Sequence, residues 1–282
     1  MAWHTERLLG FDLETTGTDP ARARIVTGAV VAIGGGRPPA RREWLADPGV
    51  LIPPDATAVH GISDEQAATG QPAAQVADAI ADVLTAAWRT GVPVVAYNAA
   101  FDLSLLAAEL HRHGLPSLRE RLGRDPAPVI DPYTIDRAVD RRRRGRRTLT
   151  AVCAEYGIGL GRAHEAAADA LAAARLARAI AGRYREIAEL AAADLHARQI
   201  AWAARRAADV QAHLRRQGDR TAVVDGHWPL RDPALPAERA PSARHPTAGD
   251  PPATGEPTPA DPATSDAPTD NPGAVEAAPV GR

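Results

Sequence analysis

The chain contains one cysteine, Cys153, and no lysine among its 282 residues. A single cysteine excludes an internal disulfide and gives no support to a cysteine-ligated zinc site. All 33 basic residues are therefore arginines, a bias that we attribute to GC-rich coding rather than to function. The formal net charge of −2 does not by itself indicate nucleic-acid binding, so local clusters must carry such an interpretation.

Long apolar runs are also missing from the sequence. No stretch supplies the run of about 20 apolar residues that crosses a bilayer, and the opening MAWHTERLLG lacks the apolar core of a signal peptide. We therefore expect a soluble, cytoplasmic protein. The length allows one large domain or two small ones with a sizeable core.

The C-terminal part is rich in proline, alanine, aspartate and threonine. Its stretch GDPPATGEPTPADPATSDAPTDNPG has no apolar period, so it buries too little surface to offset the loss of chain entropy on folding. We predict a disordered tail over residues 231–282.

Strand and helix signals alternate before this tail. RLLGFDLET and IVTGAVVAIGG predict neighbouring strands, VPVVAYN is typical of a central strand, and APVIDPYTI indicates a further strand. Helical spacing of apolar residues predicts helices over 72–90 and 194–217, and SDEQ at 63–66 has the form of a capping box. We expect an α/β domain with a mixed sheet over residues 5–182, followed by a helical extension over 183–230.

Two acidic residues lie in the first predicted strand. Asp12 and Glu14 are two positions apart, so they share one face of the strand while Phe11 and Leu13 share the other. Two like charges on one face repel each other and lose hydration when buried. A surface position, a buried arginine or a metal ion would each offset that cost.

Further acidic residues stand at the ends of other predicted elements. Asp102 follows the central strand at the start of a helix, and His164 precedes Asp169 by five residues. Five residues correspond to about 140° on a helix, so His164 must lie in the preceding loop if both side chains reach one site. Each residue alone also suits a turn, a cap or the surface. Oxygen ligands together suit Mg²⁺ or Mn²⁺, and a histidine can deprotonate a water molecule.

Three segments in order, FDLETTG, NAAFDLSLL and HEAAADAL, resemble the motifs of DnaQ-like 3′–5′ exonucleases of the DEDDh subgroup, the family of the proofreading epsilon subunit of bacterial DNA polymerase III. The resemblance covers residues 8–182 and implies a ribonuclease H-like fold. It also implies a pair of divalent cations, Mg²⁺ or Mn²⁺, for phosphodiester hydrolysis. The implied metal ligands are Asp12, Glu14, Asp102 and Asp169, and the implied general base is His164.

The same resemblance implies contacts to the substrate. Backbone N–H groups after the acidic pair are expected to hold the 3′-terminal nucleotide, and AVHGISDEQ is similar to the His-Gly-Ile segment of the family. The expected substrate-binding residues are Thr15, Thr16, His60, Asn98 and Phe101. Tyr97 stands where many members have histidine, a departure that affects substrate contacts without removing a metal ligand.

A basic run, DRRRRGRRTL at 140–149, precedes the third motif. We interpret it as a contact to phosphates, which positions a strand without reading its sequence; a solvated loop is the alternative.

The leading hypothesis is a metal-dependent 3′–5′ exonuclease that releases nucleoside monophosphates from single-stranded or frayed DNA 3′ ends, in proofreading or repair. A DNA polymerase is a further expected partner, and a membrane is not. An RNA-directed exonuclease, similar to oligoribonuclease or RNase T, is one alternative because contacts to the 2′-OH depend on geometry. A catalytically inactive nucleic-acid-binding module is another. The intact set of five motif residues argues against the inactive module.

Overall fold

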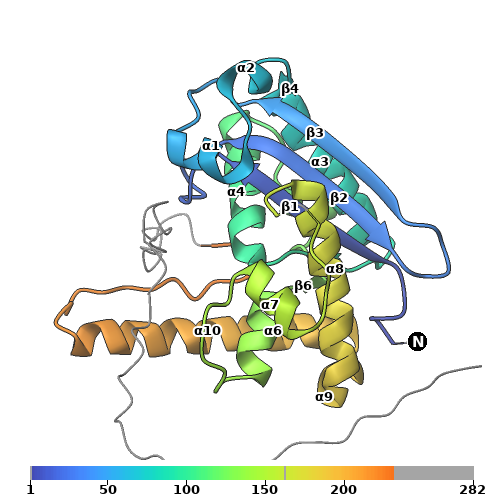
Figure 1. The fold of residues 1–282 in the computed structure, drawn as a ribbon, viewed down its shortest axis with the longest axis vertical. Helices are drawn as coiled ribbons and strands as arrows, with labels where there is room; N and C mark the ends of the chain where they lie inside the picture. The colour runs from blue at the N-terminus through green and yellow to red at the C-terminus, as the bar shows by residue number, and fades with distance from the viewer. Residues whose placement is uncertain (1, 162, 232–282) are drawn as a thin grey trace, which may run out of the picture. The chain divides into compact units, whose positions relative to one another are not determined.

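The computed structural model describes residues 2–161 and 163–231. Its centre is a six-stranded mixed sheet with the order β4-β3-β2-β1-β5-β6, and helices flank it (Figure 1). The predicted α/β mixed sheet is therefore confirmed. The strands are β1 Leu8–Thr15, β2 Ile25–Ile33, β3 Ala40–Asp47, β4 Gln71–Pro72, β5 Val94–Val95 and β6 Val129–Ile130.

The helices fall between and after these strands. Those that precede the inner strand β5 are α1 Pro54–His60, α2 Asp64–Ala67 and α3 Ala73–Arg89. Those that follow it are α4 Ala99–Arg112, α5 Leu118–Leu122, α6 Pro132–Val139, α7 Leu149–Glu155, α8 Ala166–Arg183, α9 Arg185–Ala188 and α10 Ala192–Arg216.

Strand β1 divides the core into two layers. Leu9, Phe11 and Leu13 pack into the cluster that includes the buried faces of α3 and α4. Leu8 faces the opposite cluster, which is built largely from α8. Figure 1 shows α8 crossing β1 and β2 on one side of the sheet, with α3 behind it. The alternation predicted for β1 is thus confirmed, and its α8 side also carries both acidic residues.

Strand β1 and helix α8 lie very close together at a glycine. A Cβ added at Gly10 would stand 2.1 Å from the carbonyl oxygen of Ala170, well inside van der Waals contact. Only glycine therefore lets α8 lie this close to β1. Because Ala170 directly follows Asp169, the same close approach brings Asp169 to the acidic face of β1.

This contact predicts a stability effect. Gly10→Ala should lower the free energy of unfolding by about 1–3 kcal/mol, the usual cost of overpacking, because α8 must shift away from β1. Urea denaturation measures it. The matched control is Gly182→Ala in α8, where an added Cβ meets no atom within 4 Å. Alanine there should be neutral or stabilise by up to about 1 kcal/mol. Equal denaturation midpoints for Gly10→Ala and the unmodified protein would contradict the packing argument.

One local prediction needs correction. The segment APVIDPYTI is not one strand, because β6 ends at Ile130 and α6 begins at Pro132. Asp131 is the N-cap of α6 and accepts the Tyr133 N–H, while proline suits the first helical position. The predicted capping box at Ser63 is confirmed, and it caps the short helix α2. The long helix α3 begins after Pro72 without a side-chain cap.

The helical extension packs on the edge of the sheet. Helix α10 contacts β6 and α6, and the side chain of Gln199 is fully buried there. Its Nε2 donates to Val129 O and its Oε1 accepts the Asp131 N–H at 2.7 Å. These bonds satisfy one backbone group of the edge strand β6 and one of Asp131, which follows it. Among the described residues, no helix is both long and apolar enough to cross a membrane. The predicted disordered tail lies outside the described residues, apart from Arg231.

Candidate active site

Four carboxylates from three elements converge on one side of the sheet. Asp12 and Glu14 lie near the end of β1, while Asp102 and Asp169 lie in the first turns of α4 and α8. Asp102 Oδ1 accepts the Leu13 N–H at 3.1 Å, which fixes α4 against the backbone between the two acidic residues of β1. We call Asp12, Glu14, Asp102 and Asp169 the carboxylate cluster.

Mutual repulsion and burial perturb this cluster. Burial raises the pKa of Asp12 well above its usual range, and the charges of Asp102, Glu14 and Asp169 raise it further. Burial and the nearby Asp169 raise the pKa of Glu14 to about 7. Burial also raises the pKa values of Asp102 and Asp169, against hydrogen bonds that lower them. The four groups therefore lie close enough to destabilise each other's charged forms.

The carboxylate cluster fits a divalent cation. Asp169 Oδ1 is buried and has no hydrogen-bond partner among the described residues. No arginine within the described ranges forms an ion pair with any of the four carboxylates. Hard cations prefer oxygen ligands, and a cation would offset both the repulsion and the lost hydration. A metal ion is thus the strongest of the three explanations for the acidic pair of β1.

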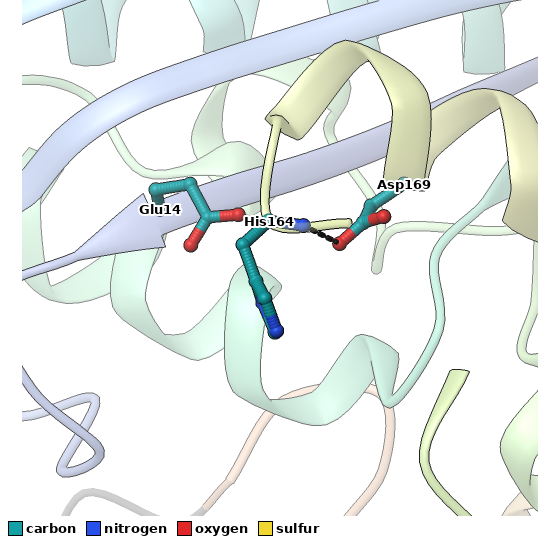
Figure 2. A group of neighbouring side chains, drawn as sticks. All are labelled: Glu14, His164 and Asp169. Carbon is teal, nitrogen blue, oxygen red and sulfur yellow. Dashed lines mark hydrogen bonds between the residues drawn. The ribbon is translucent and has the colours of Figure 1, made fainter. Parts of the chain in front are cut away.

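His164 lies in the loop directly before α8, as its spacing from Asp169 predicts. Its backbone is left-handed, with φ at 65°, and its N–H donates to Asp169 Oδ2 at 3.2 Å. Figure 2 shows this bond, and it shows the imidazole extending away from it. Ligand atoms of Glu14, His164 and Asp169 all lie within 4.8 Å of one another. The exposed imidazole therefore stands at the rim of the carboxylate cluster.

His60 ends α1 and faces the same site. Burial lowers its pKa, and the neighbouring His164 lowers it further. Its Nδ1 accepts the Ile62 N–H at 3.1 Å, whereas its buried Nε2 has no partner among the described residues. A buried nitrogen without a protein partner is available to a ligand. His60 is thus brought together with the catalytic candidates.

Hydrogen bonds within the protein hold the turn after β1. They bear on the expectation that backbone N–H groups of this turn bind the terminal nucleotide. The Thr16 N–H donates to Arg24 O at 3.0 Å, and the Thr16 hydroxyl accepts the Arg24 N–H at 2.9 Å. Arg24 is itself anchored by an ion pair with the fully buried Glu109. The backbone N–H of Thr16 is therefore not free to bind a nucleotide. The Thr15 hydroxyl donates to Gly17 O within the same turn.

The start of α4 positions the two remaining candidates. Asn98 is the left-handed N-cap, and its N–H donates to Asp131 Oδ1 at 2.9 Å. Phe101 adjoins Asp102 and packs partly buried against the core. Asp131 is buried, also accepts from Tyr133 and Thr134, and raises the pKa of Asp102. Sequence reasoning missed this supporting residue, although Asp-Pro after an apolar run signals a helix start.

The basic run divides into two groups. Arg143 and Arg147 pair with the buried Asp136, and Arg147 O also accepts the hydroxyl of Tyr97. These two arginines therefore hold the loop in place rather than offering free charges. Arg141, Arg142, Arg144 and Arg146 are exposed. The phosphate-contact interpretation thus applies to fewer arginines than the sequence suggests.

The sheet and the carboxylate cluster together define a nuclease of the DnaQ-like 3′–5′ exonuclease class with a ribonuclease H-like fold. The chain belongs to the RNase T exonuclease family, whose family model matches residues 9–177. Exonucleases of this kind use divalent metal ions.

Parts of two curated DNA polymerases are similar to this chain. The chain is 29% identical over 168 residues to a PolC-type DNA polymerase III of Streptococcus thermophilus, and 30% identical over 168 residues to that of Streptococcus suis. The match covers 59% of this chain but only 10% of each of these polymerases.

Exonuclease I structures share the fold. Escherichia coli Exonuclease I in complex with a dA16 oligonucleotide aligns with a TM-score of 0.55 at 21% identity, over 64% of this chain and 42% of that one. Exonuclease I from Methylocaldum szegediense aligns with a TM-score of 0.52 at 25% identity, over the same shares.

Proposed function

We propose that this protein is a 3′–5′ exonuclease that releases nucleoside monophosphates from the 3′ ends of single-stranded or frayed DNA. The observation that carries the proposal is the meeting of four carboxylates from β1, α4 and α8, with His164 at their rim. Membership of the exonuclease family supports the reaction class. The dA16 oligonucleotide bound to Escherichia coli Exonuclease I supports single-stranded DNA as the substrate.

Asp12, Glu14, Asp102 and Asp169 would hold the metal ions. Two bound Mg²⁺ or Mn²⁺ ions would stabilise the attacking and the leaving oxygen of an in-line phosphodiester displacement. The protein keeps these carboxylates together through the hydrogen bond from Leu13 to Asp102 and the close packing of α8 on β1.

His164 accepts the proton of the attacking water molecule. The water oxygen bonds to the terminal phosphorus and the bond to the 3′ oxygen of the preceding nucleotide breaks, so a nucleoside monophosphate leaves. His60, whose Nε2 has no partner among the residues that the structure describes, contacts the terminal nucleotide. The binding site for that nucleotide, beside the carboxylate cluster, is formed by Thr15, Thr16 and Phe101. Asn98 aligns the start of α4.

In this proposal residues 5–182 form the exonuclease domain, and residues 183–230 form an extension that supports its edge. The PolC-type relatives suggest a role beside a DNA polymerase, in proofreading or repair. The match covers only 10% of such a polymerase, so it does not include the rest of that protein. Association of this chain with a DNA polymerase is therefore proposed here.

Digestion of matched oligonucleotides tests the function. DNA and RNA strands of the same sequence, labelled at either the 5′ or the 3′ end, are incubated with Mg²⁺, Mn²⁺ or EDTA. We expect 5′-labelled DNA to shorten stepwise and 3′-labelled DNA to release a labelled mononucleotide first, only with a metal ion. Preferential digestion of RNA would instead identify an exoribonuclease. No digestion of either polymer would contradict the proposed function.

A further inference from the structure

A basic cavity of about 440 Å³ lies between α6, α10 and the loop of the arginine run. Seven arginines and three aspartates line it. They come from segments that are far apart in the sequence, since Arg137 lies in α6, Arg141 in the loop and Arg206 in α10. The fold thus brings together positive charges that no single sequence motif predicts.

Two guanidinium groups that line this cavity lie over one tyrosine ring. The guanidinium of Arg137 lies 5.4 Å from the ring centroid of Tyr133, and that of Arg206 lies 5.5 Å from it. Burial lowers the pKa of Arg137, and the like charges of Arg206 and Arg147 lower it further. Tyr133 therefore holds two guanidinium groups whose positive charges repel each other. A bound anion would offset this repulsion.

The charges of the cavity are only partly neutralised. Arg143 and Arg147 pair with Asp136, and Arg143 also contacts Asp140. Within the described residues, Arg137 and Arg206 form no ion pair, and the buried Arg206 Nε has no hydrogen-bond partner. Among the lining aspartates, Asp131 already accepts bonds from several donors and Asp225 bonds to His227. The third lining aspartate is Asp209 of α10.

The cavity adjoins the carboxylate cluster. Asn98 and Asp131 line it, and they are hydrogen-bonded to each other. Asn98 is the N-cap of α4, whose first turn carries Asp102, and the charge of Asp131 acts on Asp102. A strand with its 3′ end at the carboxylate cluster therefore has a basic cavity directly beside it.

We propose that this cavity holds the phosphodiester backbone of the substrate strand on the 5′ side of the nucleotide at the carboxylate cluster. The proposal rests on the proposed exonuclease function. Guanidinium groups donate paired hydrogen bonds that match phosphate oxygens. Contacts from these guanidinium groups to phosphate oxygens do not involve the bases. Binding at this place is therefore independent of sequence.

Binding without catalysis tests the proposal directly. The probe is a 5′-fluorescein oligothymidylate of about 12 nucleotides, within the usual site sizes for single strands, in EDTA. Fluorescence anisotropy at several salt concentrations gives Kd and its salt slope. For Arg137→Gln/Arg206→Gln we expect Kd to rise about tenfold and the log–log slope to flatten by about 1.4, at about 0.7 per lost contact. The control is Arg216→Gln, in α10 but outside the cavity, which should match the unmodified protein.

A charge-conserving pair separates binding from folding. Arg137→Lys/Arg206→Lys should keep the salt slope, because each lysine still neutralises one phosphate. Thermal unfolding verifies that all variants are folded. An unchanged Kd and slope in the glutamine pair, or an equal loss in Arg216→Gln, would overturn the proposal. Hydrolysis by the unmodified protein is measured separately, so failure of the exonuclease function is recognised on its own.

Discussion

Asp12→Asn is expected to reduce release of mononucleotides by at least about 10³-fold, several kcal/mol at about 1.4 kcal/mol per tenfold. Burial and the charges of all three other members of the carboxylate cluster raise the pKa of Asp12. Asparagine preserves its shape but removes the charge that a cation requires. Single-turnover release of labelled mononucleotide in Mg²⁺ or Mn²⁺ measures the effect.

Thermal unfolding distinguishes a lost metal site from a damaged fold. Without metal, Asp12→Asn should unfold at the same temperature as the unmodified protein or above it, because one of four repelling charges is gone. Added metal should stabilise the unmodified protein by about 2.7 kcal/mol at 100 times Kd and should not stabilise Asp12→Asn. Asp125→Asn, an exposed carboxylate paired with Arg119, is the control and should retain both responses. Full cleavage by Asp12→Asn, or in excess EDTA, would refute the metal-dependent reaction.

The features predicted correctly from the sequence depend on local periodicity. Alternation along β1 places Asp12 and Glu14 on one face whatever the strand pairs with, so this part of the site could be read directly. The five-residue spacing from His164 to Asp169 likewise required a loop position for the histidine, which the structure has. Both inferences need only the geometry of one element.

The features that sequence reasoning missed depend on contacts between distant segments. Gln199 bonds to the backbone of Asp131, 68 residues away, so the docking of α10 on β6 has no local signal. Arg147 pairs with Asp136, which removes it from the expected phosphate contacts. The cavity beside Tyr133 also arises only when α6 and α10 pack together. Arginine counts in a linear run therefore overstate the free charge of the loop.

His164→Ala is expected to lower turnover by about 10²–10⁴-fold while oligonucleotide affinity stays close to that of the unmodified protein. The carboxylate cluster supplies oxygen ligands without the imidazole, whereas water activation needs a proton acceptor. His164 is exposed and points away from its own bond to Asp169, so its removal leaves no buried cavity (Figure 2). Turnover under single-turnover conditions and anisotropy in EDTA measure the two quantities separately.

The left-handed backbone of His164 calls for a second variant. At φ 65° alanine is strained by about 1–2 kcal/mol, so His164→Ala alone could act by moving the loop. Asparagine tolerates this conformation but is no base at neutral pH, so His164→Asn should keep the loop and still lose turnover. His111→Ala, an exposed histidine of α4, is the control and should retain full activity. Recovery of turnover in His164→Asn would show that the loop conformation matters and that another group accepts the proton.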